Sequence, residues 1–414
     1  MSAQQQVANP IRIGIVGLGP AGTALVPQID ADARFALTAV CDTRVAGLAE
    51  FASRPGVRRH ASLEAFCADP DIDVAYVATP TFLHAEHSIA VLASGRHVIV
   101  EKPMAVRVDE ARAMVAAAAT AQRLLLVGHS QSFEPPLRAM RALIDSGRLG
   151  RLRAVNNWCY TDWMYKPRHP SEFDRAQGGG VVYRQAAHQV DMLRFLARGA
   201  SPVALQAVVG QWDPQRPGDG SYSAQMIFAD GLVATLFYSG YDHFAATELT
   251  FGWGPSGTRD APSYGRSRRQ ALTAASAESE LKYAEPAKSR RFSMLTPGRN
   301  SAFGILVASC EHGDLRVGEN GVLVYHDAGR ALLPLDHLPN GRAALLDECA
   351  RGLAGAPLTH DGAWGLANLE VCVGILAAAD SQGQERPGWQ HPEAPPSPPE
   401  LIDFVTRNLQ PLES

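Results

Sequence analysis

Residues 11–22 read IRIGIVGLGPAG, and this stretch decides the fold of the first part of the chain. The run IRIGIVGL is short, apolar and rich in β-branched residues, which predicts a strand buried on both faces. Gly17, Gly19 and Gly22 then form G-x-G-x-x-G ahead of a helical segment. Glycine suits this turn because the backbone bends tightly and can approach a pyrophosphate, while N–H groups at the helix start face the phosphates. The stretch therefore predicts the phosphate loop of a dinucleotide-binding domain.

The second apolar strand, FALTAVCD (35–42), ends in an acid that bears on the choice of dinucleotide. Asp42 lies twenty residues after Gly22, where a carboxylate suits the ribose hydroxyls of NAD and repels the extra phosphate of NADP. Arg44 could accept that phosphate, so NADP stays possible. The charge argument favours NAD.

Apolar strands and helical segments alternate through the rest of residues 1–130. Strands are expected at 74–80, 97–103 and 123–130, and helices at 83–95 and 108–122. This order predicts a doubly wound parallel sheet, a Rossmann domain. Since strand ends face the cofactor crevice, we expect cofactor contacts from Thr79, Pro80, His84 and Glu101. His84 could instead be a helix-start residue with local hydrogen bonds.

The tripeptide Glu101-Lys102-Pro103 closes the apolar strand HVIV and places a lysine at the crevice. Next to a positively charged nicotinamide ring, desolvation would lower the pKa of Lys102. The amine could then act as a base or hydrogen-bond a substrate hydroxyl. A surface Lys–Glu pair near a turn is the alternative interpretation.

A second domain is expected over residues 131–384, with an insertion at 255–302 that is rich in Ser, Arg, Gly and Ala. The proline-rich residues 385–414 are expected to form an extended tail on the surface. Further elements follow from the apolar pattern. Helices are predicted at 134–147, 341–354 and 364–380, and strands at 152–162, 202–212, 221–241 with a turn at Asp230-Gly231, 247–253, 303–310 and 321–334.

Residues 178–196, GGGVVYRQAAHQVDMLRFL, begin like a loop and continue like a helix. Their apolar stripe predicts an α-helix with a polar side opposite. That polar side carries Arg184, His188 and Asp191 and could be a solvated face or part of an active site.

The order of these motifs resembles the Gfo/Idh/MocA family of oxidoreductases. The motifs are IGIVGLGPAG, VATP-x-x-x-H, EKP, and GGG followed by a helix with H-x-x-D. The resemblance implies an N-terminal Rossmann domain and a C-terminal α/β domain with a large open, mostly antiparallel sheet. It also implies pyridine-nucleotide hydride chemistry without a metal. Lys102 matches the family's catalytic lysine and His188 its catalytic histidine. Family members cover the open sheet by pairing, so a homodimer or homotetramer is expected.

Arg184 departs from the family pattern. Members that act on sugars and cyclitols typically carry an aspartate four residues before the catalytic histidine. A guanidinium binds anions instead, often with two parallel hydrogen bonds, so a substrate carboxylate is expected. Arg184 could also pair with Asp191 or Glu172 and be structural.

The stretch before the helix, residues 156–177, adds aromatic and basic side chains. Trp163 and Tyr165 could form the wall for a flat ring, and Arg168 adds a positive charge that could, with Arg184, hold the carboxylates of the substrate. The alternative is an aromatic-rich strand end with solvated bases.

Four motifs are similar to phthalate 4,5-cis-dihydrodiol dehydrogenases within the family: GHSQSF-x-PP (128–136), TDWMYKPR (161–168), GGGVV-x-x-Q-x-x-HQVD (178–191) and YSGYDHF (238–244). The resemblance implies a dehydrogenase of aromatic catabolism that converts a carboxylated cis-dihydrodiol to a catechol. Two alternatives stay open: a sugar, sugar-acid or cyclitol dehydrogenase, and a regulator that binds NAD without turnover.

The composition of the chain limits the classes of binding partner that we expect. The net charge of −4 gives no reason to expect nucleic acid or a membrane surface, and no signal peptide is visible at the start. The six cysteines form no C-x-x-C pair, so no metal site is indicated. A cytoplasmic enzyme with a small-molecule substrate is expected.

Overall fold

The computed structural model describes residues 9–255, 259, 261–273, 282, 302–335, 338, 341–389, 391 and 393–412. The chain divides into two compact units. The first comprises the described residues up to Gly128 together with Leu345–Gly365, and the second comprises the other described residues.

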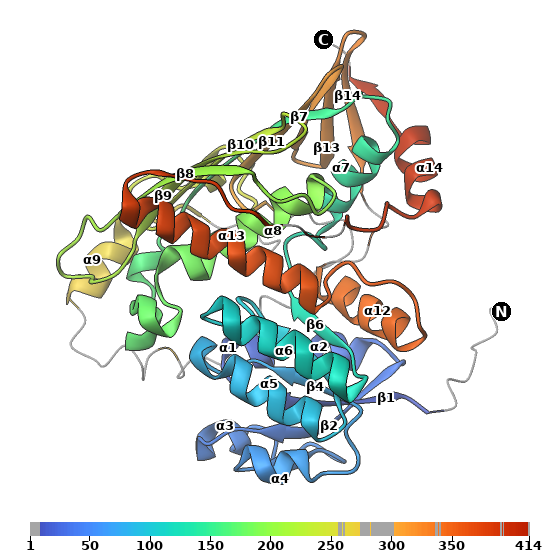
Figure 1. Ribbon diagram of the computed structural model, residues 1–414, viewed down its shortest axis with the longest axis vertical. Helices are drawn as coiled ribbons and strands as arrows, with labels where there is room; N and C mark the ends of the chain where they lie inside the picture. The colour runs from blue at the N-terminus through green and yellow to red at the C-terminus, as the bar shows by residue number, and fades with distance from the viewer. Residues whose placement is uncertain are drawn as a thin grey trace. The chain divides into compact units, whose positions relative to one another are not determined.

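The first unit is built on a six-stranded parallel sheet with the order β3-β2-β1-β4-β5-β6 (Figure 1). Its strands are β1 (Ile11–Val16), β2 (Phe35–Cys41), β3 (Arg58–His60), β4 (Val74–Val77), β5 (His97–Glu101) and β6 (Leu125–Gly128). Its helices are α1 (Pro20–Thr23), α2 (Val26–Ala31), α3 (Val45–Ala49), α4 (Leu63–Cys67), α5 (His84–Ala93) and α6 (Val108–Ala121). The predicted Rossmann sheet is confirmed.

The register of the central strands brings the predicted cofactor residues to one edge of this sheet. Val16 of β1 pairs with Val77 of β4, which pairs with Val100 of β5. The segments that follow these three strands therefore leave the sheet at the same level, and they carry the glycine turn, Thr79 and Lys102. The strand interiors are fully apolar and buried, so polar groups concentrate where the strands end.

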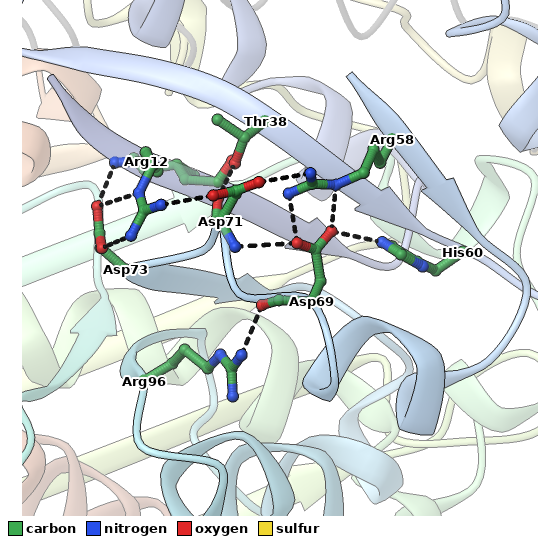
Figure 2. Close-up of polar contacts among 9 residues, drawn as sticks. Arg12, Thr38, Arg58, His60, Asp69, Asp71, Asp73 and Arg96 are labelled. Carbon is green, nitrogen blue, oxygen red and sulfur yellow. Dashed lines mark hydrogen bonds and ion pairs between the residues drawn. The ribbon is translucent and has the colours of Figure 1, made fainter. Parts of the chain in front are cut away.

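Charged side chains tie the central strand β1 and the edge strand β3 to the segment before β4 (Figure 2). Arg12 on β1 donates to both Asp71, at 2.8 Å, and Asp73, at 2.7 Å. Asp69 accepts from Arg58 of β3 at 2.6 Å and lies 2.8 Å from the Nε2 atom of His60. These contacts fix the short segment that precedes β4.

The second unit is built on a ten-stranded sheet with the order β15-β8-β9-β10-β7-β11-β12-β13-β14-β16. Its strands are β7 (Leu152–Tyr160), β8 (Ala204–Gly210), β9 (Ser221–Ile227), β10 (Val233–Ser239), β11 (Ile305–Cys310), β12 (Gly313–Val317), β13 (Gly321–His326), β14 (Gly329–Pro334), β15 (Gln384–Glu385) and β16 (Gln410–Leu412). Among these strands only β7 and β10 pair in parallel. The predicted large, mostly antiparallel sheet is confirmed.

Helices cover one face of this sheet (Figure 1). They are α7 (Pro135–Asp145), α8 (Ala187–Leu196) and α13 (Gly362–Ser381), while α9 (Arg266–Thr273), α12 (Gly341–Leu353) and α14 (Pro399–Arg407) complete the described helices. On the opposite face Trp158, Val208, Ile227 and Val233 are exposed. The predicted oligomer that would cover this face stays a prediction.

Helix α13 is long and apolar enough to span a membrane by length and composition, but 72% of its most apolar window is buried. It therefore has the character of a core helix.

Three predictions for local structure differ from the fold. Residues 247–253 are not a strand: Ala246–Glu248 form a 3-10 helix, and Phe251 has a φ of +57°, which breaks an extended backbone. Strand β12 was not predicted. The tail is extended only in part, because its end forms helix α14 and edge strand β16. Of the predicted insertion 255–302, α9 is described, and most of the rest lies outside the described residues.

Candidate active site

The glycine turn after β1 has little space for side chains. Gly17 has a φ of +95°, and a Cβ atom there would lie 2.7 Å from the carbonyl oxygen of Ala78. A Cβ atom on Gly22 would overlap the carbonyl oxygen of Gly17. Gly19 has an ordinary extended backbone and caps the four-residue helix α1, which starts with Pro20. The cradle fits a pyrophosphate, with backbone N–H groups of the turn in place of a long helix.

Asp42 follows β2, beside this turn. Its carboxylate accepts hydrogen bonds from the backbone N–H of Leu18, at 2.8 Å, and from the guanidinium of Arg44, at 2.9 Å. Its own N–H donates to the carbonyl oxygen of His60. Asp42 thus lies at the end of β2 beside the glycine turn, and its carboxylate holds the Arg44 side chain.

Lys102 comes directly after β5 in a segment held by polar contacts. The Glu101 carboxylate accepts from the Lys102 backbone N–H, at 3.2 Å, and from the Tyr76 hydroxyl. The ring of His84 is buried and contacts the carbonyl oxygens of Thr79 and Pro103, both at 2.8 Å. The contact with Thr79 is a local hydrogen bond of the kind considered for His84, whereas the contact with Pro103 is not local, and together they join the ends of β4 and β5.

The three glycines in the second unit allow a loop to pack against the start of a helix. A Cβ atom on Gly179 would lie 2.6 Å from backbone atoms of Ser171, Glu172 and Asp174. Gly180 has a φ of +81° and packs against Asp219. The loop that carries Glu172 is thereby pressed onto the helix that carries Arg184.

The polar stripe predicted on this helix does not form as expected. Val182–Ala186 is π-helical and leads into α8, so the α-helical spacing between Arg184 and His188 is interrupted. Asp191 is fully buried: one carboxylate oxygen accepts from the backbone N–H of Ser132, at 3.3 Å, and the other from the amide of Asn368, at 3.2 Å. His188 is also buried, with its ring 5.0 Å from that of Phe303. The prediction assumed α-helical spacing over the whole segment, and the π-helical residues interrupt that spacing.

Three cations converge on the carboxylate of Glu172. Arg184 donates at 3.0 Å, Arg168 at 3.3 Å, and Lys282 pairs with the second carboxylate oxygen. The side chains of the three cations are 25%, 14% and 18% exposed. We call Glu172, Arg184, Arg168 and Lys282 the cationic cluster.

The electrostatics of the cationic cluster favour a carboxylate. Burial would raise the pKa of Glu172, but the charges of Arg184, Arg168 and Lys282 outweigh burial and lower the pKa to about 2. Burial lowers the pKa of Lys282, and the charge of Glu172 opposes that change.

The two predicted aromatic side chains are both buried, and Trp163 contacts the cationic cluster. The Arg168 guanidinium lies 4.2 Å from the ring centroid of Trp163, a cation–π contact that orients it. The Tyr165 hydroxyl donates to Asp213 at 2.6 Å.

Glu172 appeared in the sequence analysis only as a possible partner of Arg184, and Lys282 was missed. The sequence carries no signal for Lys282, because its surroundings show no apolar period and no motif. The structure brings Arg168 and Arg184 together in the second unit, and the predicted cofactor residues and Lys102 together in the first.

Comparison with known proteins agrees with this geometry. Residues 11–129 match the oxidoreductase family with an NAD-binding Rossmann fold, GFO_IDH_MocA, and residues 137–251 match the GFO/IDH/MocA C-terminal domain. The chain belongs to the Gfo/Idh/MocA family. It is therefore an NAD(P)-dependent dehydrogenase with an NAD-binding Rossmann domain.

Individual Gfo/Idh/MocA relatives differ in their named substrates. The 1-carboxy-3-chloro-3,4-dihydroxycyclohexa-1,5-diene dehydrogenase of Comamonas testosteroni is 35% identical over 88% of this chain and 94% of the relative. An inositol 2-dehydrogenase of Rhizobium meliloti is 28% identical over 56% of this chain and 71% of the relative. The solved structure of a candidate dehydrogenase from Bordetella bronchiseptica RB50 has a TM-score of 0.86 and 34% identity, covering 92% of this chain and all of that one.

In the described part of this Gfo/Idh/MocA chain, no group of three or more His, Cys, Asp or Glu side chains is placed to hold a metal ion.

Proposed function

We propose that this enzyme oxidises a carboxylated cis-dihydrodiol to a catechol with NAD. The observation that supports this most directly is the cationic cluster, which holds one carboxylate already and offers the same donors to a substrate carboxylate. The Comamonas testosteroni relative, named for a carboxylated cyclohexadiene diol, supports the same substrate class.

The pairing of Arg184 with Glu172 is compatible with this role. Three cations contact Glu172, so its single negative charge leaves an excess of positive charge in the cationic cluster. The lowered pKa of Glu172 indicates a positive potential strong enough to overcome burial. A second carboxylate beside Glu172 would be attracted by the three cations and repelled by Glu172, and the attraction dominates because the cations outnumber that carboxylate.

The reaction breaks a C–H bond at one ring carbon and the O–H bond of its hydroxyl group. Bound NAD supplies the hydride acceptor. We propose that Lys102 and His188 take the hydroxyl proton, and that Arg168, Arg184 and Lys282 orient the ring through its carboxylate. The resulting hydroxy-ketone moves a ring proton to oxygen and becomes a catechol, and aromatisation makes the sequence favourable. Trp163 and Tyr165 would support this arrangement from behind, Trp163 through its contact with Arg168.

A substrate panel tests the proposal. Purified enzyme with NAD is assayed on a carboxylated cis-dihydrodiol, the same diol without its carboxylate, a cyclitol and a sugar acid. We expect NADH and catechol from the first, with kcat/KM about 10²- to 10³-fold above the uncharged diol, since charge-assisted hydrogen bonds contribute roughly 1.5–3 kcal/mol each. Higher kcat/KM on the cyclitol or the sugar acid would contradict the proposal and favour that alternative.

A further inference from the structure

His84 is a buried polar side chain that the proposed reaction does not use. It is the first residue of α5 and only 2% exposed. Its Nδ1 atom lies 2.8 Å from the carbonyl oxygen of Pro103, and its Nε2 atom lies 2.8 Å from the carbonyl oxygen of Thr79. The ring therefore bridges the segments that follow β4 and β5.

These two contacts bear on how many of the ring nitrogens of His84 carry a proton. A carbonyl oxygen only accepts hydrogen bonds, so each ring nitrogen must donate one. A neutral imidazole has a single N–H, and its second nitrogen would face a carbonyl oxygen lone pair to lone pair. Both contacts are satisfied as hydrogen bonds when the ring is doubly protonated.

The bridge acts on the segment that carries Lys102. On one side of Lys102, the Glu101 carboxylate accepts from its backbone N–H at 3.2 Å, and the Tyr76 hydroxyl anchors that carboxylate. On the other side, the carbonyl group of Pro103 is held by His84. The last pair between β4 and β5 is Val77 with Val100, and β5 last pairs with β6 at Glu101 and Gly128, so the sheet pairing ends one residue before Lys102.

We propose that His84 is a positioning residue that, as an imidazolium, locks Lys102 and the Thr79–Pro80 segment into one arrangement for the proton step. It acts through the backbone on either side of Lys102, by way of its contacts with Thr79 and Pro103. The inference rests on the proposed role of Lys102. A small displacement of a catalytic group can cost about 10²-fold in rate, so the effect falls on kcat.

The first experiment is chemical rescue. We expect His84→Ala to lower kcat by about 10- to 100-fold and to change the Kd for NAD, measured by fluorescence titration, by less than about threefold. Added imidazole should restore kcat, whereas 1-methylimidazole should not, because it can donate only one hydrogen bond when protonated. If His84 had only a structural role, both compounds would restore the kcat of His84→Ala equally, or neither would.

His97 is the matched control. It is a half-buried histidine at the opposite end of β5, where its Nδ1 atom accepts from the backbone N–H of Leu124 at 2.9 Å. We expect His97→Ala to lower Tm without lowering kcat.

The second experiment measures the protonation state of the His84 ring directly. Nitrogen-15 NMR of histidine-labelled enzyme at pH 7.5 should show one ring with two protonated nitrogens, and this signal should be absent in His84→Gln. A ring with a single N–H, or full kcat in His84→Ala, would overturn the inference. Full activity in Lys102→Ala would instead refute the proposed role of Lys102, so the two failures are distinguishable.

Discussion

At the scale of single residues, Glu134 is a buried carboxyl group whose charge state depends on pH near neutrality. Burial raises its pKa to about 7, although the charge of Arg342 and the Gly341 N–H lower it in part. The unfolded chain ionises this group from about pH 4.5, while the folded chain keeps the proton to about pH 7, so stability falls as the pH rises between these values.

Glu134→Gln should therefore stabilise the protein at pH 8 by roughly 1–3 kcal/mol relative to the parent, because the cost of a buried charge disappears. The gain should vanish at pH 4. Thermal unfolding at both pH values measures it, and an equal difference at both would contradict the assigned origin.

We propose that Asp42 and Arg44 together set the choice of dinucleotide. Asp42→Asn keeps an acceptor for the Leu18 N–H but removes the charge that repels a phosphate and holds Arg44. We expect the ratio of kcat/KM for NAD over NADP to fall at least about tenfold, since like-charge repulsion supplies the discrimination. Arg44→Ala should not shift the ratio toward NADP. An unchanged ratio in Asp42→Asn would refute the role of Asp42.

Residues whose role follows from local backbone needs could be predicted from the sequence. Gly17 belongs to this class through its positive φ, and Gly22 through its close contact with Gly17 in the same turn. The two contacts of His84 could not be predicted, because one partner, Pro103, lies nineteen residues away in the chain. Lys282 was also out of reach, since only the folded chain brings it to Glu172.

At the scale of elements, the π-helical segment Val182–Ala186 sets the angle between Arg184 and His188. Such a segment adds one residue to a helical turn, so deletion of Gln185 should restore α-helical spacing and rotate Arg184 by about 100° relative to His188.

We expect the Gln185 deletion to keep the fold by circular dichroism and to lose most of the preference for carboxylated substrates. Gln185→Ala keeps the length of the helix and serves as the control. Retained preference in the deletion variant would show that the segment does not position Arg184.

Elements with strong apolar periods were predicted well, and elements defined by their partners were not. The β4–α5–β5–α6–β6 order follows from buried runs and helix-forming segments. The 247–253 stretch alternates like a strand, yet Leu249 and Phe251 are exposed and pair with no neighbouring strand. The edge strand β16 exists because β14 offers it a partner, which its own sequence does not reveal.

At the scale of the whole molecule, the ion pairs and hydrogen bonds drawn in Figure 2 make the stability of the first unit depend on pH in the acid range. Burial would raise the pKa of Asp69, but hydrogen bonds from the Asp71 N–H, His60 and Arg58 outweigh burial and lower it. A lowered pKa means that the carboxylate stabilises the fold above its unfolded value of 3.8 and that this contribution is lost as the pH falls below it.

Asp69→Asn should cost roughly 1–3 kcal/mol of unfolding free energy at pH 7, because buried hydrogen bonds to a charged group are lost. The difference from the parent should shrink as the pH falls below about 4. Urea unfolding across this range measures it. A cost that does not change with pH would show that packing, and not charge, accounts for the loss.

The most direct test of the proposed substrate class pairs two variants with two substrates. Arg184→Ala and Lys282→Met remove cations from the cationic cluster, and Arg153→Ala removes an exposed arginine elsewhere in the second unit. We predict that the two cluster variants lower kcat/KM for the carboxylated cis-dihydrodiol by about 10²-fold and leave the uncharged diol within about threefold, while Arg153→Ala changes neither. An equal loss on both substrates would contradict a carboxylate site at Glu172.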